Sequence, residues 1–410
     1  MDHSRAAIEV FNQALAHQNA GMLEEATAGY LQALGLAPEL AAAHCNLGAI
    51  QLRQGKLQEA AGSFRRATEL KPELSPMWFS LGKVLGDLHQ LSESAGAYRE
   101  VLRLDPFHVP AHINLAVVLD QQNCREEALR HYEAAASIAP HDVQALYNLA
   151  LAKARQGHAE EAMDCFDRLL EVKPQHAEGH KSRAFLRESR AARALLSEGH
   201  TRDTLRQVVD DAHSFADRNC DYFVTAGLLA CKKGCAWCCT LQVTVGAAEV
   251  FRIAEYVREN LSEDELTKLR ARLAEVVQKT ADMDAQERAL SGLPCALLSD
   301  NACSVYPVRP LACRRWHSTN AATCEEATRR PGVDIPCKGT QLAIHDGTWA
   351  GLDAALTEAG WPHEAYHLCS ALLIALDNPD AVERWLAKEP VLEPALWKSP
   401  PSDTGRLSLL

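Results

Sequence analysis

The chain lacks the features that mark several large classes of protein. Its best apolar run, around residues 371–376, is far shorter than the roughly 20 residues of a membrane helix. It has 42 basic against 54 acidic residues, so it offers no general basic footprint for nucleic acid. Its first residues, MDHSRAAIEVFNQALAHQ, carry acids and a helical rhythm instead of a signal peptide's apolar core. We therefore expect a cytoplasmic protein that binds neither nucleic acid nor membrane.

Proline recurs every 34 residues through the first half of the chain, at Pro38, Pro72, Pro106, Pro140 and Pro174. A fixed period of this length is typical of stacked helix–turn–helix units. When each unit is counted from Ala7, positions 8 and 20 are small and position 24 is tyrosine or phenylalanine. Position 15 holds glycine, histidine or asparagine, which enter the left-handed region at low cost, as a helix end often requires. The pattern predicts five helical pairs over residues 7–176.

This small–small–aromatic–proline pattern resembles the tetratricopeptide repeat family. The resemblance implies a right-handed superhelix whose concave groove binds extended peptides or partner helices and carries no catalysis of its own. Residues 177–219 keep an apolar rhythm of three- and four-residue steps but lose the period, so we expect capping and linker helices there.

Position 6 of the repeats forms a column of amides and hydroxyls. Its members are Asn12, Asn46, Ser80, Asn114 and Asn148, with Ser182 beyond them. Because an amide both donates and accepts hydrogen bonds, such a column can hold the backbone of an extended peptide. It is similar to the asparagine ladder of O-linked N-acetylglucosamine transferase. The alternative interpretation is that these are ordinary solvated amides.

The second half of the chain is rich in cysteine. The clustered residues are Cys231, Cys235, Cys238, Cys239, Cys295, Cys303, Cys313, Cys324 and Cys337. In a reducing compartment, clustered thiols indicate metal binding more than disulfides. Arg309 and Arg314 can offset thiolate charge, and Tyr306 can orient a ligand. The other cysteines are interpreted as small buried hydrophobes, namely Cys45, Cys124, Cys165, Cys220 and Cys369.

The spacing CxxxCxxCC, followed by a CxxY and an RPxxCR segment, resembles the bacterial CxxCxxCC family, described as zinc- or iron-chelating. Carried over by position, the resemblance implies eight ligands, namely Cys231, Cys235, Cys238, Cys239, Cys295, Cys303, Cys313 and Cys324, with Cys337 as a possible extra one. A flagellin lysine methylase associated with an iron–sulfur cluster is similar in its cysteine motif. That similarity implies protein modification as a possible activity.

The first three cysteines of the cluster also have the spacing of radical S-adenosylmethionine enzymes. That fold needs a series of alternating strands and helices after the motif. Here residues 246–260 and 263–290 have the pattern of two long helices. We therefore exclude the radical enzyme fold and favour a metal site of the CxxCxxCC kind.

We therefore expect a mainly α fold class. A tetratricopeptide solenoid would be followed by a small cysteine-rich metal-binding domain with a helical C-terminal extension. Short extended pieces are predicted at residues 241–245 and on both sides of a turn at 300–301, and helices over 352–388. The cysteine domain is expected over 220–390, and residues 391–410 as a disordered tail. His317 is interpreted as a surface residue rather than a further ligand.

Two functions remain open at this stage. The first is an adaptor, in which the groove binds a peptide or protein and the cysteine domain holds two zinc ions or an iron–sulfur cluster. The second is a protein-modifying enzyme, for methyl transfer or redox chemistry, whose groove presents a polypeptide to the metal site. No nucleotide-binding glycine loop, nucleophile elbow or HExxH motif supports catalysis directly. A third option, metal storage or delivery, predicts exchangeable metal.

Overall fold

The computed structural model describes residues 2–225, 243–283, 293–299, 302–314, 339–361 and 364–396, with isolated positions at 287, 291, 323, 326 and 337. The chain divides into two compact units, Met1–Val172 and Lys173–Leu410. The described residues are mostly helical and include only short strands, which confirms the predicted mainly α class. No helix among them has both the length and the apolar character that crossing a bilayer requires.

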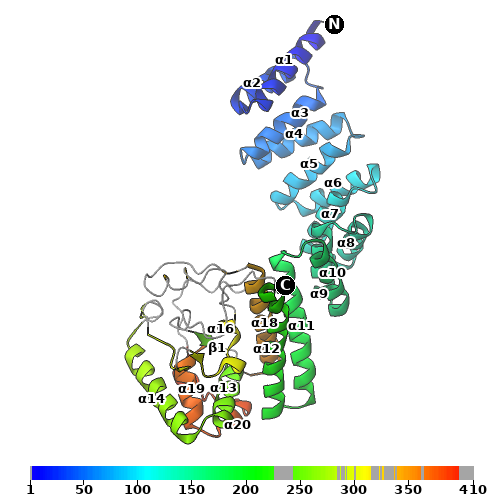
Figure 1. Ribbon diagram of the computed structural model, residues 1–410. Coiled ribbons are helices and arrows are strands. Elements are labelled where there is room, and N and C mark those ends of the chain that lie inside the picture. Colours follow the sequence, from blue (N-terminus) through cyan, green and yellow to red (C-terminus); the bar gives the residue numbers. More distant parts are fainter. Residues whose placement is uncertain are drawn as a thin grey trace. The chain divides into compact units, whose positions relative to one another are not determined.

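Helices of the first unit form five antiparallel pairs within residues 2–172 (Figure 1). The first helices of the pairs are α1 (Asp2–Asn19), α3 (Ala41–Arg53), α5 (Ser75–Asp87), α7 (Val109–Gln121) and α9 (Val143–Arg155). The second helices are α2 (Leu23–Leu36), α4 (Leu57–Leu70), α6 (Leu91–Leu104), α8 (Arg125–Ile138) and α10 (Ala159–Val172). Each pair also packs against the next, as the 34-residue period predicts.

The aromatic residue at position 24 is buried against the first helix of its own pair. A methyl group added at Gly48 would lie 3.1 Å from the Phe64 ring, and one at Gly82 would lie 2.9 Å from the Tyr98 ring. The small residue at position 8 therefore makes room for the ring. This contact explains why the two positions share one pattern along the sequence.

The turn inside each pair places position 15 in the left-handed region. The φ angles are 79° at Gly21, 74° at Gly55, 58° at His89, 61° at Asn123 and 84° at Gly157. The prediction for this column is confirmed in all five repeats, including the two without glycine, where such angles are uncommon.

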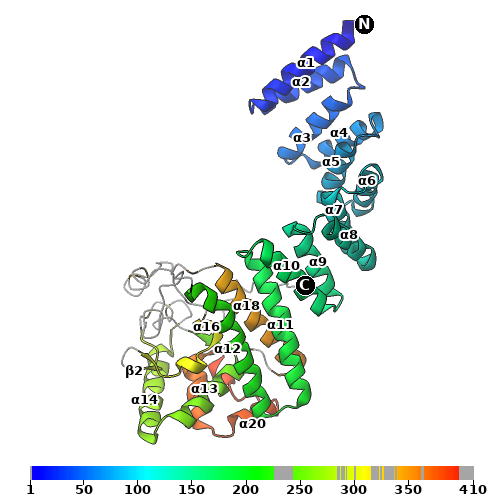
Figure 2. The ribbon, with the colours of Figure 1, turned by 45° about the vertical axis from the view of Figure 1, so that its right-hand side comes forward.

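The second unit contains the remaining described elements (Figure 2). Its helices are α11 (Ala177–Glu198), α12 (Arg202–Thr225), α13 (Ala247–Asn260), α14 (Glu263–Thr280), α16 (Leu311–Arg314), α18 (Gly339–Glu358), α19 (Leu368–Asp377) and α20 (Ala381–Leu386), with short 3-10 turns η2 (Tyr306–Val308) and η3 (Glu393–Ala395). Strand β1 (Thr244–Val245) pairs antiparallel with β4 (Tyr366–His367), and β2 (Leu298–Ser299) pairs antiparallel with β3 (Ala302–Cys303). Extended pieces are thus present at residues 244–245 and on both sides of residues 300–301, as predicted, while residues 241–242 and 300–301 lie outside the described part of the chain.

One apolar cluster forms the core of the second unit. It joins α12, α13, α14 and α19 through buried residues such as Val209, Ile253, Leu269 and Leu372. The cluster also includes Leu392 and Ala395, so the expected disordered tail is wrong for residues 391–396, which pack on this core through η3. Residues 397–410 lie outside the described part of the chain.

Helices α11 and α18 lie side by side (Figure 1; Figure 2) although they are far apart in sequence. A methyl group at Gly347 would lie 2.2 Å from the Lys181 carbonyl oxygen, and one at Gly351 would lie 2.6 Å from that of Phe185. The two glycines therefore permit a backbone approach that any side chain would prevent. Residues 177–219, which the sequence suggests as caps and linkers, thus belong to the second unit and help to form its helical wall.

Candidate functional site

The structure describes only part of the predicted cysteine ligand set. Five of the eight predicted ligands lie outside the described residues, as does His317. They are Cys231, Cys235, Cys238, Cys239 and Cys324. The other three predicted ligands, Cys295, Cys303 and Cys313, are described and form no disulfide. The same is true of the possible extra ligand, Cys337. The geometry of the site is therefore built from these cysteines and their surroundings.

Cys295 and Cys303 are brought together by the β2–β3 hairpin. Cys303 pairs with Leu298 across the hairpin, and the Leu298 backbone N–H donates to the Cys295 carbonyl oxygen over 3.0 Å. Both cysteines pack against the apolar core, so the hairpin presents two sulfurs from a fixed base.

Cys313 lies in the short helix α16, which a buried carboxylate holds in place. The Glu249 side chain of α13 is almost fully buried and accepts the Leu311 backbone N–H over 2.7 Å. The same carboxylate oxygen lies 3.3 Å from Nε2 of His213 in α12. Burial lowers the pKa of His213, so near pH 7 it is a neutral partner of Glu249.

Arg314, next to Cys313, is buried and anchors the same turn. Its guanidinium donates to the carbonyl oxygens of Arg309, over 2.7 Å, and Pro307, over 2.6 Å, and forms an ion pair with Asp217 of α12. These partners show that Arg314 positions the turn and that its charge is matched by Asp217. Arg309 itself lies 4.2 Å above the Tyr306 ring, a cation–π contact within the segment that leads to Cys313.

Cys369, interpreted from the sequence as a buried hydrophobe, is partly buried and packs against the apolar core of the second unit. Burial and then the neighbouring Cys369 sulfur raise the pKa of the Cys295 thiol, with Cys313 and Cys303 adding to the effect. Sequence spacing gave no signal for this neighbour, because α19 reaches the hairpin only through the tertiary fold. Cys295 and Cys303 belong to the hairpin segment, Cys313 to α16 and Cys369 to α19.

The donor set fits a soft or borderline cation. Sulfur donors suit zinc and iron, and a bound cation would relieve the repulsion between neighbouring thiolates. In the described part of the chain, no three histidine, cysteine, aspartate or glutamate side chains are already arranged around one metal position. Cys295, Cys303 and Cys313 would hold the ion as thiolates.

A cavity of about 300 Å³ lies beside the turn that carries Cys313. Leu311 and Ala312 of α16 form one side, and His345, Asp346 and Trp349 of α18 form another. A volume of this size accommodates a small ligand or a single side chain. The cavity therefore provides a space for a reactant next to a predicted metal ligand.

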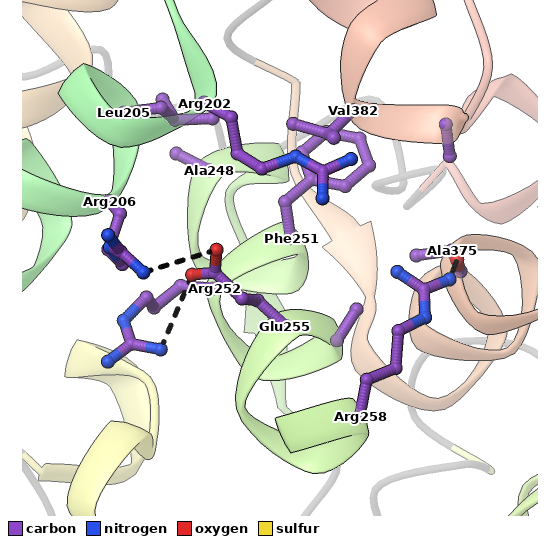
Figure 3. A pocket seen from close by; sticks show the side chains of 12 residues that line it. Arg202, Leu205, Arg206, Ala248, Phe251, Arg252, Glu255, Arg258, Ala375 and Val382 are labelled. Carbon is purple, nitrogen blue, oxygen red and sulfur yellow. Dashed lines mark hydrogen bonds and ion pairs between the residues drawn. The ribbon is translucent and has the colours of Figure 1, made fainter. Parts of the chain in front are cut away.

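A second depression, in the same unit, is filled by ion pairs (Figure 3). Arg206 of α12 and Arg252 of α13 both approach the Glu255 carboxylate, at 3.5 and 3.6 Å. Arg258 donates to the Ala375 carbonyl oxygen over 2.6 Å, near the end of α19. The space left is about 20 Å³, room for one water molecule. We interpret this depression as a network that joins helices.

Two of the predicted groove asparagines have partners inside the solenoid. Nδ2 of Asn46 donates to the Tyr30 hydroxyl over 3.1 Å, and Nδ2 of Asn114 donates to the Tyr98 hydroxyl over 3.3 Å. Each bond joins a helix to the preceding repeat. The nitrogens of these two amides therefore have a structural role. The oxygen of each amide can accept a hydrogen bond from a bound peptide.

A column of ring nitrogens in the solenoid escaped the sequence analysis. At position 4, the rings of His44, Trp78 and His112 each place a nitrogen within 2.9–3.1 Å of the carbonyl oxygen of the proline that closes the preceding repeat. The signal was available, because ring nitrogens recur at this position at the 34-residue period. These bonds satisfy carbonyl groups left over at the end of a helix.

Comparison with known families places these features in two classes. Tetratricopeptide repeat models match residues 41–74, 79–143 and 125–184. The model described as "Putative zinc- or iron-chelating domain" and named CxxCxxCC matches residues 230–331. The chain thus carries tetratricopeptide repeats followed by a CxxCxxCC domain, as its sequence motifs predict. No curated protein matches the chain.

Three solved structures that are similar to this chain cover between 42% and 51% of it. YrrB, described as "a TPR protein with an unusual peptide-binding site", is 25% identical over 42% of this chain and 88% of its own, with a TM-score of 0.39. A MamA structure is 20% identical over 43% and 96%, with a TM-score of 0.40. PilF of Pseudomonas aeruginosa is 18% identical over 51% and 91%, with a TM-score of 0.39.

Proposed function

We propose that this protein is a metal-containing adaptor. Its solenoid binds an extended peptide or protein segment, and its second unit binds zinc or iron through the cysteine cluster. The observation that carries the metal half is the match of residues 230–331 to the zinc- or iron-chelating domain model, within which Cys295 and Cys303 pack against one apolar core. The remaining ligands of this proposal are Cys231, Cys235, Cys238, Cys239, Cys313 and Cys324, with Cys337 in reserve.

Eight thiolates suit two four-thiolate zinc sites, which would be closed and structural. They suit equally one iron–sulfur cluster with one zinc ion. In either case the metal would join the hairpin, the α16 turn and the CxxxCxxCC segment into one domain. The protein would act in the cytoplasm, where thiols remain reduced.

For the groove, we propose that the position-6 column contacts the backbone of the bound chain. The residues concerned are Asn12, Asn46, Asn114 and Asn148. The Tyr30 and Tyr98 hydroxyls fix two of these amides through Nδ2, which supports a role for the amide oxygens as acceptors of backbone N–H groups. Recognition of this kind depends little on the sequence of the bound peptide.

Anaerobic purification with metal analysis and visible spectroscopy tests the metal half. Colourless protein with about two zinc ions per chain supports the adaptor with structural zinc. Brown protein with broad absorption near about 400 nm supports an iron–sulfur cluster. Protein that folds and stays free of both metals contradicts the proposal.

Peptide selection on the immobilised full chain tests the groove half. The selected peptides are then measured against the variant Asn12→Ala/Asn148→Ala, which leaves the Asn46 and Asn114 bonds to tyrosine in place. Weakened binding of peptides of unrelated sequence supports backbone recognition by the column. Unchanged binding shows that the asparagines do not contact the peptide.

The second candidate function is that of a protein-modifying enzyme, and the 300 Å³ cavity beside α16 favours it. His345 and Asp346 could exchange a proton with a reactant held there, close to the Cys313 turn. Titration of the metal-loaded protein with S-adenosylmethionine and with small anions that bind open iron sites tests this function. A change in the visible spectrum on either addition, altered in the Asp346→Asn variant, would support an enzyme. A visible spectrum that neither addition changes would favour the adaptor.

A further inference from the structure

One face of the first helices of the repeats carries almost no charge. Positions 2, 5, 6 and 9 share this face, because residues three and four apart lie on the same side of a helix. We call the residues at these positions of the five repeats the position-6 face. Lys83 alone among them is charged, although charged residues make up 23% of the chain. The face therefore offers a partner mostly apolar side chains and amides.

The position-6 face is open in the structure. The residues at position 2 are all exposed, namely Ile8, Ala42, Pro76, Pro110 and Gln144. Ile8 is 53% exposed, and Val117, at position 9 of the fourth repeat, is 37% exposed. These apolar residues share a face with the amides of position 6, so a chain held by those amides would contact them.

Aromatic rings stand at position 5 of alternate repeats. Phe11, Phe79 and Tyr147 belong to the first, third and fifth repeats, and each packs against the position-24 ring of its own repeat. The distances between ring centroids are 5.6, 5.7 and 6.0 Å. The three rings are only partly buried, so each is fixed from below and accessible from the face. The repeats between them carry the smaller Cys45 and Ile113.

Lys83, at position 9 of the middle repeat, is an available cation. It is exposed and takes part in no ion pair with the described residues. The positions that border the face, 12 and 13, carry charges of both signs, namely Arg53, Asp87, Asp120 and Arg155. The border therefore adds no net charge, and the charge of the face is that of Lys83.

We propose that the position-6 face binds an extended, mainly apolar peptide segment that carries one acidic side chain near its middle, opposite Lys83. The proposal rests on the proposed function of the groove and specifies its partner. Complementary charge favours the acid at this one place, and the absence of other charges on the face disfavours charged residues elsewhere, because they would lose water without gaining a partner.

The repeat spacing also sets the spacing of large apolar residues in the peptide. Helices α3, α5, α7 and α9 each contact the next, and packed helices lie about 10 Å apart. Rings in alternate repeats are then about 20 Å apart, the length of about six residues of extended chain. Side chains separated by six residues point to the same side of an extended chain. We therefore expect large apolar residues at about every sixth position.

Labelled peptides of about 13 residues, which at this spacing span the five repeats, test the proposal on the full chain. Each has leucine at its first, seventh and last residues and threonine elsewhere. In one series a single glutamate replaces each threonine in turn, and in a matched series lysine does. Fluorescence anisotropy gives the affinities. Glutamate beside the central leucine should bind about fivefold more tightly than lysine there, as an exposed ion pair allows.

Four variants assign the effect to residues. Lys83→Glu should invert the preference, so that lysine binds more tightly than glutamate at the same place. Lys56→Glu changes an exposed lysine that precedes α4 outside the face, and should keep the wild-type preference. Val117→Thr should weaken all the peptides by about fivefold. Val172→Thr, at the 40% exposed end of α10, should not.

Peptides that bind the wild type with no preference for glutamate at any place, and that bind Lys83→Glu and Val117→Thr equally well, overturn this proposal. The groove function still stands in that case if Asn12→Ala/Asn148→Ala weakens their binding. Wild type that binds neither these peptides nor any selected peptide overturns both.

Discussion

The Asn114 amide donates to the Tyr98 hydroxyl across a boundary between repeats, 16 residues apart in sequence. Phe64 and Ser80 occupy the equivalent positions one repeat earlier, also 16 residues apart. Phenylalanine has no hydroxyl, and the Ser80 hydroxyl donates to the Pro76 carbonyl oxygen of its own helix. An amide thus follows a tyrosine, and a serine follows a phenylalanine. The position-6 column therefore carries a structural requirement besides any role in the groove.

A double-mutant cycle measures this coupling. Tyr98→Phe and Asn114→Ser should each lower the free energy of unfolding by about 1 kcal/mol, because each leaves one partner of a hydrogen bond without the other. The double variant recreates the Phe64–Ser80 combination and should cost less than the sum of the two. Urea unfolding followed by circular dichroism gives the three values. Strictly additive values would show that the pair is not coupled.

The close approach of α11 and α18 should make Gly347 sensitive to a single methyl group. Gly347→Ala should lower the stability of the second unit by about 1–3 kcal/mol, because the added Cβ would overlap the Lys181 carbonyl. Gly62→Ala, in helix α4, has nothing within 4 Å and should be neutral or stabilising, by up to about 1 kcal/mol. Thermal unfolding of the two variants checks this. Equal effects would mean that the helices can separate without cost.

The buried Glu188 of α11 should make stability depend on pH. Burial raises its pKa from the ordinary 4.5 to about 7. Between those values the folded state holds a proton that the unfolded state has released, so stability is highest below 4.5 and falls as pH rises to about 7. Glu188→Gln should remove this fall and be more stable near pH 7.5, by at most about 3 kcal/mol.

Unfolding free energies measured from pH 4 to 8 test the Glu188 prediction. Glu198→Gln, at the exposed end of the same helix, serves as the control and should keep the wild-type profile. A Glu188→Gln profile parallel to that of wild type would show that the carboxyl group has the same pKa in the folded and unfolded states.

Arg314 should be required for the α16 turn and so for metal retention by Cys313. Arg314→Lys cannot replace the donors to Asp217, Pro307 and Arg309, and should cost about 3 kcal/mol, as breaking a buried charged network does. Arg193→Lys alters an exposed pair with Glu358 and should change stability by less than about 1 kcal/mol. Chelator titration followed by circular dichroism compares them. Equal metal retention would contradict the positioning role.

The solenoid could be predicted well from local patterns, because the same residue types recur at the same positions of each 34-residue repeat. The left-handed turns at His89 and Asn123 could be inferred from a column of five residues, and the buried rings from their small neighbours. The β2–β3 hairpin was likewise visible as a turn between extended pieces. In each case the interacting residues are close in sequence or related by the period.

The tertiary contacts of the second unit could not be predicted from the sequence, because they join segments that are far apart in the chain. No spacing signal connects Thr244 to His367, its partner in the β1–β4 pair. The interpretation of Arg314 as a cation for thiolates was incomplete, because its partner Asp217 lies on a distant helix. Sequence patterns report which face of a helix is buried, but not which distant segment covers it.

At each boundary between repeats, a tyrosine is followed 16 residues later by asparagine and a phenylalanine by serine. The repeats are therefore not interchangeable in their order. Loss of residues 109–142 would bring Tyr98 before Asn148, a combination that already occurs in the chain. Loss of residues 41–74 would bring Tyr30 before Ser80, which does not occur at this spacing. Duplication and deletion of whole repeats would therefore be tolerated unequally along the gene, although every repeat has the same length.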